Sequence, residues 1–502
     1  MRAGAVITLA VAGLLAGCLV GPDYERPAAP TPVRFKEAEG WKLGEPQDAA
    51  DRGQWWAIYN DPVLDALERT IDVSNQNLRA AEAAYRQARA VVAEARAGLF
   101  PTLSVTGSGT QSGQGGGGSR GSSFITTGTG TAIGTGGGGR GSSSQSTLDL
   151  TADLSWSIDL WGRIRRTVES DVATAQASAA DLANARLSAQ AQLATLYFEL
   201  RASDELKRLL DAAVVAFTQS LQITRNQYAV GVVGQADVVT AETLLEQTRA
   251  QGIATGVQRA QFEHAIASLV GKPPGDFAIE PALIAAAVPV APPGVPSGLL
   301  ERRPDIAGAE RRMAGANAQI GVAVSAFYPD LTLSASYGFT SSNLSKLLRA
   351  ANNFWSVGPQ LAETVFDAGL RSAQVAGARA TYDETVAVYR QTVLTGFQQV
   401  EDELAALRIL AQQADVQANA VRLAREAERL TLNQYQAGTV AYTAVLTAQT
   451  TALANEETEV GIKQSRLVAS VALIQALGGG WNAAVLPNIE QVESDDPPAA
   501  NP

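Results

Sequence analysis

Residues 147–160, TLDLTADLSWSIDL, alternate strictly between polar and apolar side chains. A period of two puts each class of side chain on its own face of a β-strand, because successive side chains point to opposite faces. The segment is longer than the roughly 9–11 residues that a tilted strand needs to cross a bilayer. Strands of soluble sandwiches seldom alternate for so long. We therefore predict a membrane-spanning strand.

Three other segments alternate in the same way. Residues 331–340 do so clearly, and residues 102–106 and 354–361 more weakly. Pro359 suits a central strand poorly, because proline has no N–H to donate. We predict two hairpins whose tips lie at 107–145 and at about 341–353. The first tip is almost entirely Gly, Ser and Thr, a composition typical of flexible coil, and is expected to be an extracellular loop.

Long helices are predicted between the hairpins. Residues 163–230 contain neither glycine nor proline, enough for a rod of about 100 Å. Apolar residues recur there in steps of four and three, and in the second half of the chain every seven residues. The positions are Leu210, Val214, Phe217, Leu221, Thr224 and Tyr228, then Leu446, Leu453, Val460, Leu467 and Ile474. Such heptads indicate left-handed coiled coils.

The chain also repeats itself. Residues 226–241 align without gaps on residues 433–448, with half of the positions identical, and residues 273–304 are rich in proline. We predict two structural repeats joined by a linker. The predicted organisation is a signal peptide (1–17), an extended lipid-anchored segment (18–60), a first repeat (61–272), a Pro-rich linker (273–299), a second repeat (300–480) and a C-terminal tail (481–502).

The N-terminus has the features of a secretory signal, a positive start at Arg2 and an apolar core over residues 5–15. The sequence Leu-Ala-Gly-Cys that ends at Cys18 resembles a bacterial lipobox, in which cleavage precedes a cysteine that receives diacylglycerol. Leu19 follows the cysteine, rather than the aspartate that marks inner-membrane retention, so we expect an outer-membrane lipoprotein held by several acyl chains. The alternative is an ordinary signal peptide with an incidental cysteine.

Composition excludes several functions. The net charge of −11 argues against a nucleic-acid partner. With Cys18 as the sole cysteine and His264 as the sole histidine, neither a disulfide nor a zinc cluster is expected. After residue 20 no apolar run is long enough for a transmembrane helix. We expect no cofactor, no metal and no catalytic residues, and therefore no enzyme.

Four membrane-spanning strands cannot close on themselves. A spanning sheet with free edges leaves backbone groups unpaired in hydrocarbon, and single-chain barrels start at eight strands. The barrel must therefore be shared among copies of the chain. Two copies give eight strands and three give twelve.

In this context the chain resembles TolC-type outer-membrane efflux ducts, specifically the lipoprotein branch called NodT-like or OprM-like. The resemblance covers nearly the whole mature chain. The motifs that carry it are Cys18-x-Val20-Gly21-Pro22-Asp23-Tyr24-x-x-Pro27, Trp55-Trp56, Asp61-Pro62-x-Leu64, Asp159-Leu160-Trp161-Gly162-Arg163, Arg303-Pro304-Asp305-Ile306 with Ala309-Glu310, Phe366-Asp367-x-Gly369, and Ala476-Leu477-Gly478-Gly479-Gly480-Trp481.

The resemblance implies a mixed α/β membrane fold. A homotrimer would form a twelve-stranded β-barrel, with four strands per chain, continued by a long periplasmic α-helical coiled-coil barrel. It further implies a passive duct for drugs, other small toxic compounds or metal ions. The implied partners are outer-membrane lipid, a periplasmic membrane-fusion adaptor and an inner-membrane pump of the RND type.

The repeated stretches fall between coiled-coil helices, where Gly231 and Gly438 suit a chain reversal because positive φ is cheap for glycine. The resemblance makes these turns the periplasmic tip that meets the adaptor. It also matches Asp237 and Tyr435 to a hydrogen-bonded pair at the tip, although Val440 replaces the basic residue of that network. Ala444 and Thr447 stand where some family members carry acidic rings.

The alternation also assigns sides to the strands. Asp149, Asp153 and Asp159 are expected to face the lumen and make it mildly cation-favouring. Trp156 is expected to face lipid, with Trp161 and Trp355 near opposite interfaces, as in aromatic girdles.

Other functions remain open from sequence. They are an exit duct for type I protein secretion, a passive porin and a lipid-anchored coiled-coil structural lipoprotein. A porin would lack the long rods and paired turns, and a coiled-coil spacer would lack the alternating strands. The lipobox and the ALGGGW motif favour the efflux branch over protein secretion.

Overall fold

The computed structural model describes residues 19–32, 34–37, 54–113, 144–289 and 298–493. The predicted signal peptide, Cys18 and most of the predicted first loop lie outside these residues. The chain divides into two compact units. The first comprises residues 1–23, 93–169 and 318–378, and the second comprises residues 24–92, 170–317 and 379–502.

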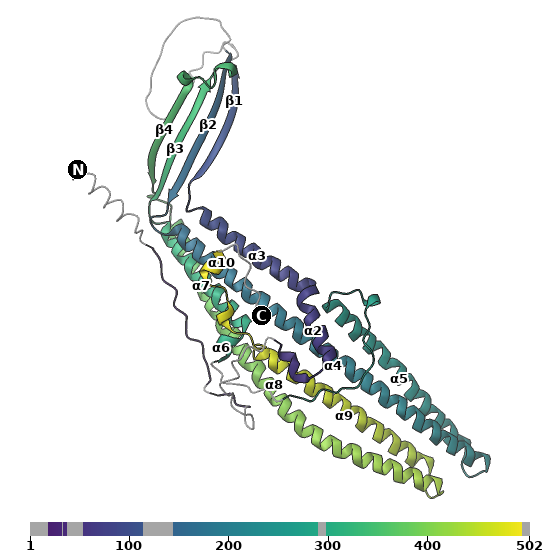
Figure 1. The fold of residues 1–502 in the computed structure, drawn as a ribbon. Helices are drawn as coiled ribbons and strands as arrows, with labels where there is room; N and C mark the ends of the chain where they lie inside the picture. The colour runs from purple at the N-terminus through teal and green to yellow at the C-terminus, as the bar shows by residue number, and fades with distance from the viewer. Residues whose placement is uncertain (1–18, 33, 38–53, 114–143, 290–297, 494–502) are drawn as a thin grey trace. The chain divides into compact units, whose positions relative to one another are not determined.

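The first unit contains a four-stranded antiparallel sheet in the order β1-β2-β3-β4 (Figure 1). Its strands are β1 (Thr102–Gly113), β2 (Ser144–Ile158), β3 (Asp330–Ser341) and β4 (Asn353–Ala362). Two short 3₁₀ turns, η5 (Leu344–Lys346) and η6 (Ala350–Asn352), connect β3 to β4. Each strand overlaps one of the four alternating segments of the sequence.

The first hairpin is longer than the sequence analysis predicted. Residues 107–113, assigned there to the flexible loop, belong to β1 and pair with the start of β2, down to Gly113 opposite Ser144. Glycine and serine weaken a strand, but their backbone groups still complete the ladder once β2 supplies partners. Pro359 lies in β4, an outer strand of this sheet, where a missing N–H is tolerated.

Helices make up most of the rest of the chain. They are α2 (Pro62–Ser74), α3 (Gln76–Ala97), α4 (Arg163–Ala229), α5 (Gln235–Leu269), α6 (Leu299–Arg302), α7 (Pro304–Ser325), α8 (Leu370–Gln436), α9 (Tyr442–Ala476) and α10 (Ile489–Glu493). Short 3₁₀ turns are η2 (Trp55–Tyr59), η3 (Pro274–Asp276) and η7 (Ala483–Val485). None of the described helices is both long and apolar enough to cross a bilayer.

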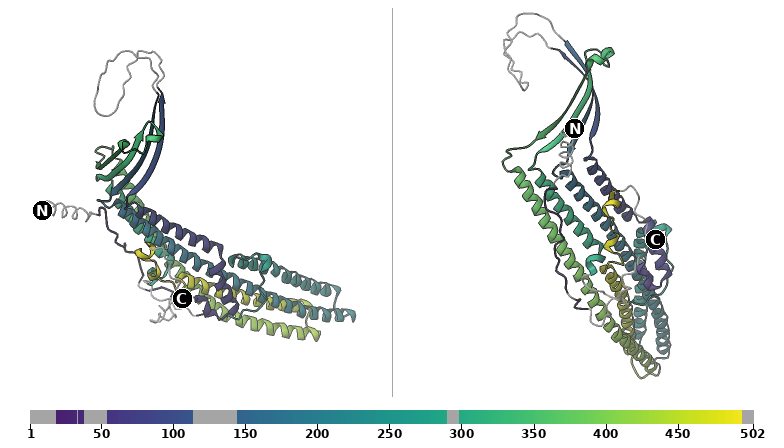
Figure 2. Two further views of the ribbon diagram at one scale, coloured as in Figure 1. Left: turned by 45° about the horizontal axis from the view of Figure 1, so that its top comes forward. Right: turned by 60° about the vertical axis from the view of Figure 1, so that its left-hand side comes forward.

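Four pairs of corresponding elements in the two halves have equal lengths, whereas β2 has 15 residues and β4 has 10. Both α3 and α7 have 22 residues, and both β1 and β3 have 12. Likewise α4 and α8 have 67 residues, and α5 and α9 have 35. In the second unit the long parts of α4, α5, α8 and α9 run side by side in both views of Figure 2.

Two apolar clusters hold the second unit together. The larger buries aromatic side chains of η2 against α4, including the edge-to-face pair Tyr59 and Phe198, whose ring centroids are 4.9 Å apart. The smaller lies near the ends of the long helices, around Phe217, Leu221 and Tyr435. Most of the predicted heptad positions of α4 are buried, but Tyr228 is 47 % exposed.

The predicted linker packs against the second unit. The Arg201 guanidinium donates to the carbonyl of Glu280 over 2.7 Å, and Asp204 accepts from the backbone N–H of Ala282 over 3.1 Å. Ile279 and Ile284 are buried. The described part of the linker is therefore tied to the helices it connects.

The N-terminal segment is extended and also packs in the second unit. The Tyr24 hydroxyl donates to Glu310 over 2.5 Å, and the Arg26 guanidinium donates to the hydroxyl of Tyr389. Further along, Phe35 is buried edge-to-face against Phe397. These contacts hold an otherwise irregular segment in place.

Candidate functional site

The register of the sheet gives its two faces different chemistry, although Gln111, Ser146, Ser341 and Asn353 share the otherwise apolar face near the far ends of the strands. Directly paired residues of neighbouring strands share a face, so Leu154 of β2, for example, lies with Leu103 of β1 and Ala335 of β3. The face so defined is apolar: Leu103 and Val105; Leu148, Leu150, Ala152, Leu154, Trp156 and Ile158; Leu331, Leu333, Ala335, Tyr337 and Phe339; and Trp355, Val357, Pro359 and Leu361. On the outer strands the side chains of this face are exposed, with Leu103 at 70 % and Trp355 at 71 % exposure, and those of β2 are half-buried.

The opposite face consists almost entirely of Ser, Thr, Asp, Gln and Gly. Hydroxyl groups pair across the strands there, as in the contacts of Thr106 with Thr151 at 2.9 Å and Ser336 with Ser356 at 2.7 Å. A sheet with one continuous apolar face and one hydrogen-bonding face suits a boundary between hydrocarbon and water.

The three aspartates predicted for one face separate into two groups. Asp149 and Asp153 lie on the polar face, opposite Thr340 and Ser336 of β3. Asp159, however, lies one residue beyond the end of β2, so its assignment as a strand residue is wrong. Its carboxylate accepts from the backbone N–H of Arg165 over 3.0 Å and pairs with the Arg165 guanidinium at 3.3 Å. It therefore closes the first turn of α4, where unpaired N–H groups need acceptors.

The predicted interface tryptophans lie at distinct places. Trp156 is on the apolar face, and its indole N–H donates to the carbonyl of Leu99 over 2.9 Å. Trp161 follows β2, stacks on Tyr328 and donates to the carbonyl of Pro329 over 2.9 Å. Trp355, opposite Tyr337, belongs to the part of the sheet nearer the β3–β4 connection. The indole N–H groups of Trp156 and Trp161 are thus both hydrogen-bonded to backbone carbonyls.

The two repeated turns share one backbone geometry. Gly231 has φ +79° and Gly438 has φ +71°, which confirms the predicted left-handed conformation. In each turn the glycine N–H bonds the carbonyl three residues back, and the following N–H bonds the carbonyl five residues back. This is the Schellman arrangement that ends a helix. A Cβ at either glycine would meet nothing within 4 Å. The turns therefore favour glycine because of the positive φ, and not because neighbouring atoms leave no room for a side chain.

Asp237 and Tyr435 do not form the pair that the resemblance suggests. The Asp237 carboxylate accepts from the backbone N–H of Gly234 over 3.3 Å and caps α5. The Tyr435 hydroxyl donates to Thr224 Oγ1 over 3.2 Å, and its ring lies edge-to-face on Tyr442. Tyr435 is 2 % exposed, and burial raises its pKa. It is therefore a core residue of the turn region, and its assignment to the docking surface is wrong.

The sequence analysis did not identify the residues that form hydrogen bonds with Tyr435. They are Thr224 and Gln227, whose side-chain amide donates to the Tyr435 carbonyl over 3.2 Å. The signal was available, since the same triplet, Asn-Gln-Tyr, opens both repeated stretches. The surface of the first turn is apolar, with Val230 at 75 % and Val232 at 62 % exposure beside Gly231, whereas the second turn exposes Gln436 and Thr439.

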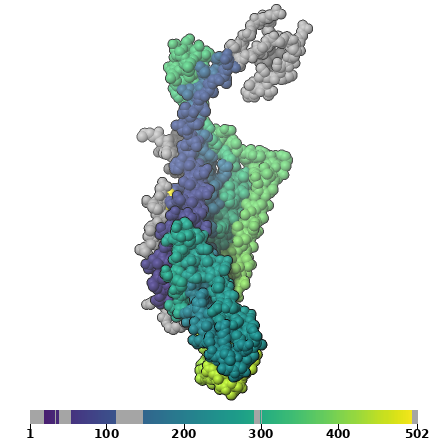
Figure 3. All heavy atoms as spheres, turned by 90° about the vertical axis from the view of Figure 1, so that its right-hand side faces the viewer, coloured from purple at the N-terminus to yellow at the C-terminus, as the bar shows by residue number. Residues whose placement is uncertain are grey.

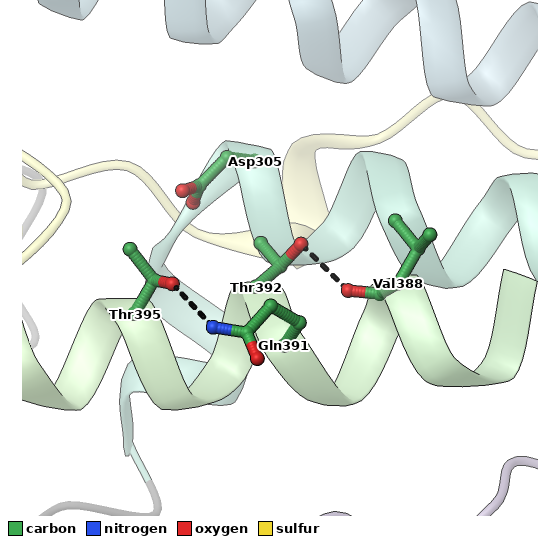
Figure 4. Close-up of a pocket in the computed structure, with 5 residues that line it drawn as sticks. All are labelled: Asp305, Val388, Gln391, Thr392 and Thr395. Carbon is green, nitrogen blue, oxygen red and sulfur yellow. Dashed lines mark hydrogen bonds between the residues drawn. The ribbon is translucent and has the colours of Figure 1, made fainter.

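The second unit also has a shallow hollow of about 240 Å³ between α7 and α8 (Figure 4). Its polar side chains bond along α8, Thr392 to the carbonyl of Val388 and Gln391 to the hydroxyl of Thr395. Among the described residues no three or more His, Cys, Asp or Glu side chains could together hold a metal ion.

Comparison with known proteins identifies the family. The family model for outer membrane efflux proteins matches residues 69–272 and 295–479. The chain is 31 % identical to the toluene efflux pump outer membrane protein TtgC of Pseudomonas putida over 480 residues, 95 % of this chain and 96 % of that protein. It is 30 % identical to nodulation protein T of Rhizobium leguminosarum bv. trifolii, over 93 % and 96 % of the two chains.

Among solved structures, the outer-membrane channel OprN is similar, with a TM-score of 0.81 and 28 % identity over 92 % of this chain and all of that one. The separated faces of the sheet and the paired turns thus occur in a chain that matches efflux proteins along both of its halves. The chain belongs to the outer membrane efflux protein family.

Proposed function

We propose that this protein is the passive outer-membrane exit duct of a tripartite efflux pump. The observation that carries the proposal is the sheet, whose apolar face runs without interruption across four strands. Its outer strands, β1 and β4, each have one side without a partner among the described residues. In hydrocarbon such edges must be paired, since each unpaired backbone group costs several kcal/mol.

Three copies satisfy this requirement, with β1 of one copy pairing with β4 of the next in a twelve-stranded barrel. Asp149 and Asp153 then face the lumen. The long helices α4, α5, α8 and α9 continue the duct into the periplasm as a coiled-coil barrel. The two halves, residues 61–272 and 300–480, act as structural repeats, which their equal element lengths support.

Lipidation of Cys18 adds a membrane anchor beside the sheet. The chain just after Cys18 is fixed within the first unit, where the Val20 N–H donates to the carbonyl of Trp161 over 3.2 Å. The buried Arg166 pairs with Asp23 at 2.8 Å and also donates to the carbonyl of Val20. Acyl chains on Cys18 would thus enter the bilayer near Trp161, at the end of β2.

The turns at Gly231 and Gly438 are the proposed contact with a periplasmic adaptor, which connects the duct to an inner-membrane pump of the RND type. The exposed Val230 and Val232 give the first turn an apolar character suited to a protein partner. The cargo is a drug or other small toxic compound. The toluene pump named for a relative supports that class.

Deletion of the gene tests the function. The deleted strain should become sensitive to some apolar toxic compounds, and the full-length chain should restore resistance. The purified protein should sediment as a trimer, and Cys18→Ser should lose incorporation of labelled fatty acid. A monomeric protein, or a deletion that changes secretion of a protein and no susceptibility, would overturn the proposal.

A further inference from the structure

The connection between β3 and β4 carries the positive charge of the sheet. Its charged residues are Lys346 and Arg349, both exposed, and residues 342–352 contain no Asp or Glu. Among the described residues of the four strands and this connection, Lys346 and Arg349 are the only cations. Asp149, opposite Thr340 near this end, lies on the polar face of the sheet. In a chain with a net charge of −11, the connection is therefore locally positive.

Neither cation is neutralised within the described part of the chain. No ion pair among those residues involves Lys346 or Arg349. Beyond the opposite end of the sheet, by contrast, the Arg371 guanidinium pairs with the Asp367 carboxylate at 2.6 Å. The two cations of the connection are thus open to an anion from outside the chain.

Exposed leucines accompany the cations. Leu344 and Leu348 are 75 and 70 % exposed, and they alternate with Lys346 and Arg349 within six residues. Single exposed leucines are ordinary on a protein surface, but these two continue the apolar face of the sheet, whose Trp355 lies just after the connection at 71 % exposure. The connection therefore combines a cationic and an apolar surface at the end of a face that suits hydrocarbon.

Hydrogen bonds hold the backbone of the connection in one form. The Lys346 N–H donates to the carbonyl of Asn343, and the Arg349 N–H donates to the carbonyl of Lys346, each over 3.1 Å. The Asn352 side-chain amide also donates to the carbonyl of Lys346, over 2.7 Å. The connection is thus a compact structure at the ends of β3 and β4 (Figure 1), green near the top of Figure 3. A preformed surface loses less conformational freedom when it binds.

The register of the sheet determines which end carries the connection. Gly113 lies opposite Ser144, and Phe339 lies opposite Asn353, so the β1–β2 and β3–β4 connections leave the sheet at the same end. The helices α3 and α4 adjoin β1 and β2 at the other end. In the proposed duct the helices are periplasmic, and the β3–β4 connection therefore lies at the outer leaflet of the membrane.

We infer that the β3–β4 connection binds anionic lipid of the outer leaflet. The Arg349 guanidinium suits two oxygens of one phosphate, and the Lys346 ammonium acts as a point charge on the headgroups. Leu344 and Leu348 enter the adjoining acyl region, as apolar side chains of interfacial segments do. The inference rests on the proposed duct and adds a lipid site to it.

Lipid binding by the full-length protein tests this site. The protein is reconstituted in phosphatidylcholine nanodiscs with increasing amounts of lipid A, whose two phosphates make it the anionic probe, and the bound lipid is counted by native mass spectrometry. Lys346→Gln combined with Arg349→Gln should lower the affinity for lipid A roughly fivefold for each charge removed. The charge-preserving pair Lys346→Arg and Arg349→Lys should retain most of the binding.

A matched control removes the same charge elsewhere. Arg379 and Arg390 are exposed on α8 in the second unit, and Arg379→Gln with Arg390→Gln should leave lipid A binding unchanged. Equal loss in both double variants would show that net charge alone governs binding and would overturn the site.

The depth of the leucines gives an independent measurement. A bimane on Leu348→Cys should be quenched by lipids with brominated acyl chains, whereas a bimane on Arg390→Cys should not. Absence of quenching at residue 348 would contradict the insertion of the connection into the leaflet.

Failure of the site can be distinguished from failure of the duct. A trimer that restores resistance, but whose Lys346→Gln/Arg349→Gln variant binds lipid A like the natural protein, would overturn the site and leave the duct intact. Loss of trimers in that variant would show that the connection contacts another copy, and would also overturn the site. A monomeric natural protein would contradict the proposed function itself.

Discussion

The hydroxyl of Tyr435 on α8 donates a hydrogen bond to Thr224 on α4 over 3.2 Å, next to the turns that end both helices. The Tyr435 ring also lies edge-to-face on Tyr442 of α9, with centroids 5.5 Å apart. One buried side chain therefore ties together three of the four long helices at the tip.

The packing of this ring can be separated from its hydrogen bond. Tyr435→Phe keeps the ring and removes one bond, worth about 1 kcal/mol. Tyr435→Ala leaves a cavity, and truncation of a large aromatic residue in a core costs about 3–5 kcal/mol. We expect hydrogen exchange in residues 224–245 and 431–450 to rise slightly in the first variant and strongly in the second. Unchanged exchange in Tyr435→Ala would contradict the place of Tyr435 in the tip core.

The glycines of the turns are expected to matter more for transport than for assembly. Gly231→Val and Gly438→Val force a β-branched residue to positive φ, at a cost of about 1–2 kcal/mol each. Trimer yield should remain normal, but susceptibility should rise and cross-linking to the adaptor should weaken. Gly231→Asn and Gly438→Asn, which tolerate this conformation better, are the matched controls. Full resistance with both valines present would defeat the docking proposal.

The acidic residues of the sheet should set ion selectivity. Asp149 and Asp153 are on its polar face, so Asp153→Asn should reduce the preference for cations in planar bilayers. Asp159→Asn is the control, because Asp159 caps α4 beside Arg165. It should lower thermal stability without changing selectivity. Equal loss of selectivity in both variants would contradict the assignment of the two faces.

Glu68 should make stability depend on pH. It is buried in α2, and among the described residues neither carboxylate oxygen has a hydrogen-bond partner. Burial, with the negative charges of Asp72 and Asp65, raises the pKa of Glu68 to about 9. The native protein then keeps a proton that the unfolded chain releases above its ordinary pKa of 4.5.

The contribution of protonated Glu68 to the free energy of unfolding is thus fully present below that ordinary pKa. It is lost as the pH rises toward about 9. Glu68→Gln should remove this loss. The melting temperature of the natural protein should therefore fall relative to Glu68→Gln as the pH is raised across the interval. Parallel curves for the two proteins would show that Glu68 is not held protonated.

The sequence predicted the parts of the structure that depend on local periodicity. The alternation over 147–160 identified the apolar face of β2, and the repeated glycines identified both turns. The same alternation gave a wrong assignment at Asp159. The sequence keeps a period of two beyond the end of β2, and the role of Asp159 in capping α4 follows only from the path of the backbone. Burial of Tyr435 depends on α4, which is distant in sequence. It could be predicted only from the way in which the two repeats pack against each other.

The central claim is that the apolar face of the sheet meets lipid and the polar face meets water in the lumen. Single cysteines at consecutive positions from Asp149 to Leu154 test it in intact outer membranes, with a water-soluble maleimide and with the natural protein as the background. The account predicts labelling at Asp149, Thr151 and Asp153 and protection at Leu150, Ala152 and Leu154. Equal labelling at consecutive positions would contradict it.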